Sequence, residues 1–198
     1  MRILSGKLKG SKILTNNKKF KGSESFVTRP TSDRVKETLF NILEHGFNID
    51  FSMISFFDCF SGSGAVGLEA ISRGCSIVSF LDKDNVACEC ITKNLANFKL
   101  HQNDQINSLH ILNYDFFDKD LSLNNKFDVV FFDPPYELMK AGKVLMRLKE
   151  LRVTKINSLI IYESNRELEK TDHLEILRSR KIGKTYLNFF KGFIQKSG

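Results

Sequence analysis

Strand-length apolar runs alternate with helical repeats along most of the chain. Mostly apolar runs, typical of buried strands, occupy residues 54–57, 77–81, 109–112, 127–132 and 159–162. Between them, apolar side chains recur at helical spacing in residues 65–71, 85–98 and 138–148. This alternation predicts a Rossmann-like, doubly wound α/β fold with a mostly parallel sheet and helices on both faces.

The two ends of the chain have different patterns. Residues 1–28 are polar and rich in lysine, which predicts an irregular arm that includes a hairpin. A helix is expected at 33–45, capped by Thr31 or Ser32 and closed by Gly46. Near the other end, residues 174–177 and 185–194 predict an antiparallel pair that completes a seven-stranded sheet. We therefore divide the chain into a basic arm, 1–30, and an α/β domain, 31–198.

Composition restricts the class of protein. Hydrophobic residues make up 41% of the 198, and charged residues 27%, as in soluble globular proteins. No apolar run approaches the roughly 20 residues of a membrane span, and the first residues are too polar for a signal peptide. We expect a cytoplasmic monomer without a membrane partner. The four cysteines show no metal-site spacing, so we predict buried free thiols and no metal.

The net charge of +7 is unevenly distributed. The first 45 residues hold ten Lys and Arg against four acids, a net charge of +6. Residues 166–198 add +4, which leaves the middle of the chain at −3. A basic front end suggests a polyanionic partner, although composition alone is equally compatible with a solvated lysine-rich tail.

A glycine-rich turn follows the first strand. Gly62, Gly64 and Gly67 fit the G-x-G-x-x-G pattern between a strand and a helix, where the backbone can approach a ligand closely. The pattern alone is compatible with a nicotinamide or flavin pyrophosphate, with S-adenosylmethionine, or with a chance glycine triplet. Asp58 favours S-adenosylmethionine, because its carboxylate suits an α-ammonium group and would repel a pyrophosphate.

Four acids fall where strands are predicted to end, which is where such sheets bind ligands. They are Asp58, Asp82, Asp115 and Asp133. Asp82 lies at about the spacing of the acid that holds ribose hydroxyls, and Asp115 could accept from an adenine amine. Each acid alone could be a cap or turn residue; their joint placement indicates a site. The cofactor contacts expected beside them are Phe60, Ser61, Lys83 and Phe116.

The fourth of these strands runs directly into Asp133-Pro134-Pro135-Tyr136. Strand termination by prolines is the simplest explanation. The same tetrapeptide is typical of enzymes that methylate exocyclic amines of bases. The Asp133 carboxylate and the Pro134 carbonyl could accept the two N–H bonds of an aryl amine and stabilise charge developing on its nitrogen. Pro135 would help to fix that carbonyl, and Tyr136 could stack on an extruded base.

Four blocks of the sequence resemble the bacterial 16S ribosomal RNA guanine-N(2) methyltransferases. The blocks are residues 1–10, 29–41, 58–69 and 133–136. The resemblance covers residues 1–163 well and the tail only loosely. It implies a class I methyltransferase fold, S-adenosylmethionine as donor, and a guanine of 16S ribosomal RNA or of a small-subunit assembly particle as acceptor. Many amine methyltransferases have Asn at the position of Asp133, whereas Asp is usual in this family.

RNA contacts are expected on the basic arm and at the start of the first helix. These residues are Arg2, Lys7, Lys9, Arg29, Pro30, Thr31 and Arg34. Two other functions stay open at this stage. A nicotinamide-dependent oxidoreductase would give no role to Asp58 or to residues 133–136. A non-catalytic RNA-binding or assembly module would not require Asp58, Asp82 and Asp133.

Overall fold

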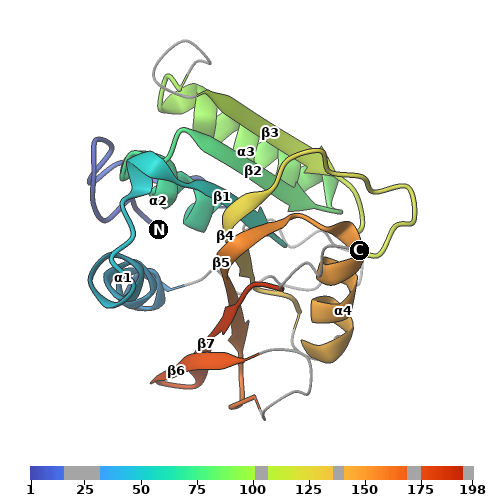
Figure 1. Cartoon of the computed structure of the whole chain (residues 1–198). Helices are drawn as coiled ribbons and strands as arrows, with labels where there is room; N and C mark the ends of the chain where they lie inside the picture. The colour runs from blue at the N-terminus through green and yellow to red at the C-terminus, as the bar shows by residue number, and fades with distance from the viewer. Residues whose placement is uncertain (16–31, 101–106, 136–140, 169–174, 194–198) are drawn as a thin grey trace.

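The protein is built around one sheet, seen here in a computed structural model of the whole chain (Figure 1). The structure describes residues 1–15, 32–100, 107–135, 141–168 and 175–193. Within them, seven strands follow the order β3-β2-β1-β4-β5-β7-β6. Their bounds are β1 Ser55–Cys59, β2 Ile77–Asp82, β3 Ser108–Asn113, β4 Phe127–Phe132, β5 Thr154–Ser164, β6 Ile176–Ile182 and β7 Thr185–Lys191.

The directions of the strands identify the edge of the sheet where a ligand is expected. β1 to β5 pair in parallel, whereas β7 is antiparallel to both β5 and β6. This confirms the predicted doubly wound sheet with its antiparallel border. The strand order changes direction at β1, which pairs with β2 on one side and β4 on the other. In open α/β sheets the crevice outside the carboxyl ends of such strands is where ligands bind.

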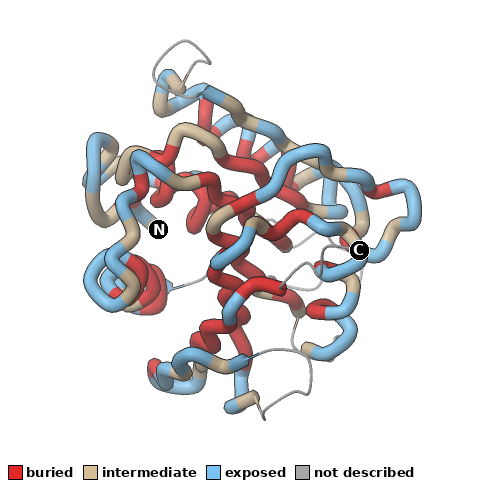
Figure 2. Tube along the Cα trace, viewed as in Figure 1, coloured by how far each residue is buried: buried red, intermediate tan, exposed pale blue. Residues whose placement is uncertain are grey.

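Helices cover both faces of the sheet. They are α1 Asp33–Asn41, continued by the π-helical turn η1 Ile42–Gly46, the 3-10 turn η2 Phe51–Met53, α2 Ala65–Ser72, α3 Asn85–Asn97 and α4 Ala141–Leu151. The core under α1, α2 and α3 includes Phe56 and Phe80, and the core under α4 includes their neighbours Phe57 and Leu81. Successive strand residues therefore face opposite cores, and the central strands are buried along most of their length (Figure 2).

Local signals explain where the elements begin. The Ser32 hydroxyl caps α1 by accepting from the Val35 N–H at 3.3 Å, and the Asp84 carboxylate caps α3.

All four cysteines are buried free thiols, as predicted. No described helix is both long enough and apolar enough to cross a bilayer.

Candidate active site

The loop from β1 to α2 has the geometry that its glycines predict. Gly62 and Gly64 adopt positive φ angles of 54° and 74°, which side-chain-bearing residues rarely tolerate. A Cβ on Gly67 would lie 2.3 Å from the Phe80 ring, so this glycine allows α2 to pack closely on β2. A Cβ on Gly62 would meet no atom within 4 Å. The loop backbone at Gly62 therefore faces open space in which a ligand could lie.

Asp58 is a buried carboxylate beneath this loop. The prediction that it ends the strand is wrong, because it lies inside β1 and is only 2% exposed. Its Oδ2 accepts the Gly67 N–H at 2.8 Å. Burial raises the pKa of Asp58 well above its usual value, and the nearby charges of Asp133 and Asp82 raise it further. A cation placed beside Asp58 would stabilise its ionised form, which fits the expected ammonium group.

Asp82 is the last residue of β2 and contacts the glycine loop directly. Its Oδ2 accepts the Gly62 N–H at 2.8 Å, and its Oδ1 accepts the Asp84 N–H at 2.9 Å. Burial raises its pKa, while these two N–H groups oppose the shift. Because the side chain is only partly buried, Asp82 combines a fixed position with access to a ligand.

Ser61 holds the ends of β1 and β2 together. Its buried hydroxyl donates to the Asp58 carbonyl at 2.6 Å and accepts the Leu81 N–H at 2.9 Å. The structure therefore gives this side chain a role in shaping the loop, and its predicted contact with the cofactor stays a prediction.

Aromatic rings form a wall beside the loop. Phe60, which has a φ of 58°, lies 5.4 Å from Phe116 and 6.3 Å from Phe132, measured between ring centroids. Phe116 is 1% exposed, and Phe132 stands between it and Tyr162. The sequence reasoning named Phe60 and Phe116 but missed Phe132 and Tyr162. Their positions at the carboxyl ends of apolar strands were the available signal.

Lys83 follows the end of β2, and Asp115 lies just beyond the end of β3, the outermost parallel strand. The Asp115 Oδ1 accepts the Phe117 N–H at 2.9 Å, and its Oδ2 lies 3.5 Å from the Lys83 Nζ. Both side chains are substantially exposed. The Asp115 carboxylate thus orders the turn after β3. Its exposure is compatible with a contact to adenine, which stays a prediction.

Asp133 and Pro134 follow β4 immediately, adjacent to the end of β1. Pro134 is buried, and Asp133 and Pro135 are partly exposed. Asp133 raises the pKa of both Asp58 and Tyr162 through its charge, although burial is the larger cause in each case. The structure therefore brings three of the four predicted acids, those at 58, 82 and 133, to one place. Tyr136 lies outside the described residues.

The first 15 residues are folded onto the body. A bridge between Arg2 and Lys12 forms the expected hairpin. The Glu69 carboxylate of α2 accepts the N–H groups of Leu4 and Ser5 at 2.8 and 3.0 Å. A Cβ on Gly6 would lie 1.8 Å from the Ser72 carbonyl oxygen, so the backbone approaches α2 very closely. This segment is docked on α2, and the predicted boundary at residue 30 stays a prediction.

A buried ion-pair network underlies this docking, and sequence reasoning missed it. Lys36 and Glu69 are both fully buried, with 3.5 Å between the Lys36 Nζ and a Glu69 carboxylate oxygen. The Lys36 ammonium also donates to the Arg2 carbonyl at 2.6 Å. Arg73 completes the network at 3.2 Å from Glu69. Lys36 is one of the ten basic residues counted in the first 45, but its enclosed charge is not available to a polyanion.

Asn94 of α3 joins the docked segment to the glycine loop. Its Oδ1 accepts the Leu14 N–H at 2.7 Å, and its Nδ2 lies 3.1 Å from the carbonyl oxygens of both Leu14 and Ser63. The side chain is fully buried. The segment that precedes residues 16–31 is therefore anchored to the same residue as the loop beside the site.

The predicted RNA contacts divide into two groups. The described ones are Arg2, Lys7, Lys9 and Arg34. Arg29, Pro30 and Thr31 lie outside the described residues. The Arg2 side chain is 69% exposed and lies 4.0 Å from Asp33, so it is accessible from solvent.

Comparison with known proteins assigns the family. The family described as "Conserved hypothetical protein 95" matches residues 1–191. The chain belongs to this family. It is 35% identical to ribosomal RNA small subunit methyltransferase D of Haemophilus influenzae, in an alignment covering 92% of this chain and 89% of the relative. The resemblance inferred from the four sequence blocks is thereby confirmed.

Two solved structures agree with the fold of this family member. The inferred methyltransferase yhhF of Escherichia coli has a TM-score of 0.75 and 26% identity, and covers 98% of this chain and 99% of its own. The inferred methylase HI0767 of Haemophilus influenzae has a TM-score of 0.73 and 27% identity, covering 98% of each chain. The sheet is thus the class I S-adenosylmethionine-dependent methyltransferase fold with antiparallel carboxyl-terminal strands.

Proposed function

We propose that this protein transfers a methyl group from S-adenosylmethionine to the exocyclic N(2) of a guanine in 16S ribosomal RNA. The observation that carries the proposal is the juxtaposition of two motifs. The glycine loop with Asp58 and Asp82 lies at the ends of β1 and β2, and Asp133-Pro134 follows the adjacent strand β4. The family relationship, through a relative named as a ribosomal RNA methyltransferase, supports the choice of RNA.

The residues present fit the donor. The open space at Gly62 accommodates a ligand, the buried Asp58 suits its ammonium group, and Asp82 is placed for ribose hydroxyls. The adenine lies toward Asp115 and the ring of Phe116, between the ends of β2 and β3. When bound, the donor would supply an electrophilic methyl group on a sulfonium, whose methyl–sulfur bond breaks to release a neutral thioether.

Asp133 and Pro134 act on the acceptor. A guanine amine is a poor nucleophile because its lone pair is delocalised into the ring. The Asp133 carboxylate and the Pro134 carbonyl accept hydrogen bonds from its two N–H groups, which turns the lone pair toward the methyl carbon and stabilises the charge that develops on nitrogen. The Asp133 carboxylate is placed to take the proton that the methylated nitrogen loses. The rest of catalysis is positioning. No group of His, Cys, Asp and Glu among the described residues could hold a metal ion.

The substrate is either free 16S RNA or a small-subunit assembly particle, and the enzyme acts as a monomer in the cytoplasm, where that RNA is assembled. The oxidoreductase alternative has no support from the geometry, because the carboxylate of Asp58 underlies the loop where a pyrophosphate would bind. The non-catalytic alternative would have no use for three acids gathered at one edge, where burial and, to a smaller extent, the charges of Asp133 and Asp82 raise the pKa of Asp58.

Isothermal titration tests the donor assignment. The wild-type protein is expected to bind S-adenosylmethionine and to show no measurable affinity for NAD or NADP. Asp82→Ala should weaken that binding by roughly 1–3 kcal/mol, because ribose hydroxyls lose their charged acceptor and the Gly62 N–H loses its partner. Asp84→Ala is the matched control: it removes the α3 cap and a neighbouring negative charge but leaves the Asp82 carboxylate in place, and it should leave affinity within about twofold. Equal affinities of the folded Asp82→Ala variant and the wild type would overturn this placement.

A further inference from the structure

The turn between β6 and β7 lies at the same edge of the sheet as Asp133. Phe132 of β4 pairs with Tyr162 of β5, and two residues further on Ser164 pairs with Tyr186 near the start of β7. β7 is therefore two strands away from β4, roughly 10 Å at the usual spacing of neighbouring strands. An RNA strand with one base at Asp133 would extend over this turn.

The turn carries an uncompensated positive charge. Arg180 and Lys181 at the end of β6 and Lys184 in the turn are all exposed. Within the described residues, none of the three forms an ion pair with an acid. The Lys181 ammonium lies 5.4 Å from the centre of the partly exposed Tyr186 ring. Cations beside an accessible aromatic ring are the combination that single-stranded nucleic acid requires.

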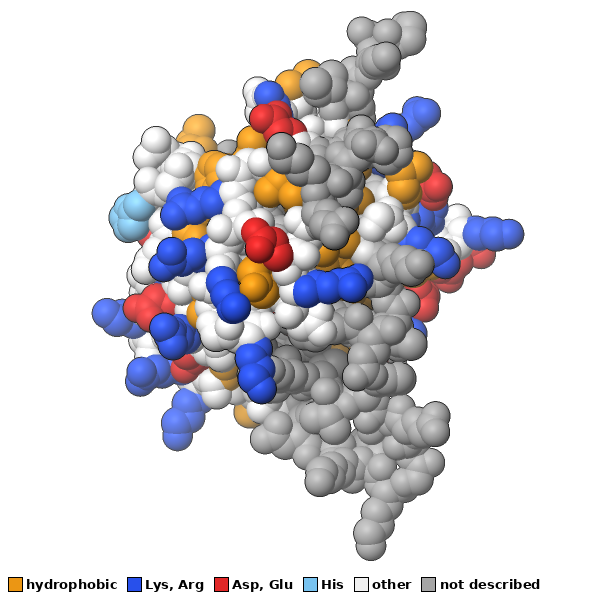
Figure 3. Space-filling model, turned by 90° about the horizontal axis from the view of Figure 1, so that it is seen from below, with side chains coloured by type: hydrophobic (Ala, Val, Ile, Leu, Met, Phe, Trp, Pro, Cys, Tyr) orange, Lys and Arg blue, Asp and Glu red, His pale blue; other side chains and the backbone are white. Residues whose placement is uncertain are grey.

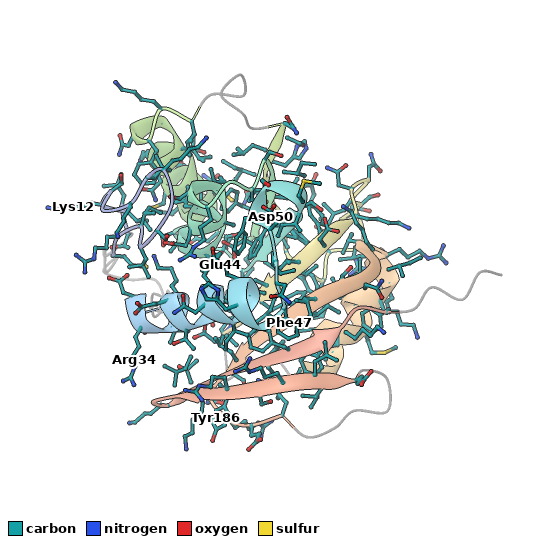
Figure 4. All side chains as sticks on the ribbon, turned by 60° about the vertical axis from the view of Figure 1, so that its left-hand side comes forward. Lys12, Arg34, Glu44, Phe47, Asp50 and Tyr186 are labelled. Carbon is teal, nitrogen blue, oxygen red and sulfur yellow. The ribbon has the colours of Figure 1, made fainter. Side chains whose placement is uncertain are left out.

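The start of α1 adds a further cation. The Phe47 ring, just after η1, lies 5.4 Å from the Phe189 ring of β7, so this helical segment packs on the hairpin. Figure 4 shows Arg34 pointing outward from the first turn of α1, close above the β6–β7 turn, and Figure 1 places the same two elements side by side. Seen from below, many Lys and Arg side chains, with isolated acids between them, lie over the part of the face that is not drawn in grey (Figure 3).

We propose that Arg34, Arg180, Lys181, Lys184 and Tyr186 form an RNA-docking surface, the β6–β7 surface, beside the active site. The four cations bind phosphates of the strand that flanks the target guanine, and the Tyr186 ring stacks on a neighbouring base. The inference rests on the proposed function, because it takes the position of the target guanine from Asp133. It keeps Arg34 among the predicted RNA contacts and adds contacts on the hairpin of β6 and β7, beyond those expected in the basic arm.

Another basic residue follows the end of β5, on the side of the active site. Arg166 follows that strand and is exposed. Its charge opposes the rise in the pKa of Tyr162 that burial and Asp133 cause. The charges of Arg166 and Asp133 therefore act on the same phenol, that of Tyr162. The edge carries acids at the ends of β1, β2 and β4; beyond β5 it carries Arg166 beside Glu167, and then the three cations of the β6–β7 turn. This arrangement suits an amine acceptor within a phosphate-bearing chain.

Edge protection is the competing explanation. Lysine and arginine on an outer strand such as β6 deter pairing with another chain. That role accounts for Arg180 and Lys181, but Lys184 lies in the turn and Arg34 lies on a helix, where no strand edge needs protection. Edge protection predicts that removing these cations leaves RNA affinity unchanged, whereas the docking surface predicts weaker RNA binding.

The test is RNA binding as a function of salt for the triple variant Arg180→Ala, Lys181→Ala, Lys184→Ala. The probes are a 16S ribosomal RNA transcript and small-subunit particles that lack the methyl group. The matched control is Lys99→Ala, Lys149→Ala, Arg152→Ala, three exposed cations at the opposite edge: Lys149 lies in the last turn of α4, and Lys99 and Arg152 follow the ends of α3 and α4. S-adenosylmethionine affinity is titrated for all three proteins.

The triple variant should bind RNA at least tenfold more weakly near 0.1 M salt, with a slope of log affinity against log salt reduced by about 2, since each single-strand phosphate contact contributes about 0.7. Tyr186→Ala should lose about fivefold or more, with an unchanged slope. The control should match the wild type, and cofactor affinity should be unchanged throughout. Equal slopes in the triple and control variants would overturn the β6–β7 surface. Binding is measured apart from methyl transfer, so a wild type that bound RNA but methylated no guanine would overturn the proposed function alone.

Discussion

Replacing Asp133 with alanine is expected to reduce kcat for methyl transfer by about 10²–10³, the effect of losing a preorganised polar group at the reacting atom. The fold should tolerate the change, because Asp133 is partly exposed and its charge raises the pKa of the buried Asp58. Affinity for S-adenosylmethionine should stay within about twofold. Single-turnover kinetics at saturating donor and RNA measure the chemical step directly.

Asp133→Asn provides the informative comparison. An asparagine oxygen can still accept one N–H of the acceptor amine, so this variant should retain more activity than Asp133→Ala. Full activity in Asp133→Ala, or a loss of donor binding with normal transfer at saturating donor, would contradict the role assigned to this carboxylate.

Replacing Glu69 with alanine is expected to lower the free energy of unfolding by about 3–5 kcal/mol, the cost of leaving one partner of a buried ion pair alone. The Lys36 ammonium would lose the carboxylate 3.5 Å away, and the N–H groups of Leu4 and Ser5 would lose their acceptor. Burial already lowers the pKa of Lys36, and the charge of Glu69 opposes that shift. Urea denaturation measures the change.

Glu44→Ala is the matched control for this network. Glu44 is paired with Arg73 at 2.9 Å, but its side chain is 42% exposed, so its loss should cost at most about 1 kcal/mol. Should Glu69→Ala fail to accumulate in folded form, Glu69→Gln keeps an acceptor oxygen without the charge and should fall between the two. A Glu69 variant no less stable than the Glu44 variant would contradict the account of the docked segment.

The sheet was predictable because parallel strands bury both faces. Their residues form apolar runs, and these runs predicted the strands to within about two residues, except that β5 begins at Thr154, five residues before the predicted 159. The glycine loop was predictable because positive φ angles restrict the residue type. The same reasoning placed the end of β1 one residue early, at Asp58, and did not predict its burial. The Gly67 N–H provides a hydrogen-bond partner for the enclosed carboxylate.

The docking of residues 1–15 could not be predicted from sequence. Polar composition suggested an arm, but the partners that hold this segment, Glu69 and Asn94, lie far along the chain. Nothing local distinguishes Lys36, which is enclosed, from a solvated lysine, because the difference depends on Glu69. Deleting the first 15 residues would therefore remove the buried side chains of Ile3 and Ile13 from the core as well as removing charge.

Methylation of ribosomal RNA by the purified protein tests the central claim most directly. Small-subunit particles and free 16S RNA from a strain that lacks the gene are incubated with labelled S-adenosylmethionine, and the nucleosides are mapped by mass spectrometry. The account predicts one methyl group per 16S RNA, located on the N(2) of a single guanine, and absent with Asp133→Ala. A wild-type protein that binds the donor but transfers no label, or that labels a ring nitrogen, a ribose or a protein instead, would contradict it.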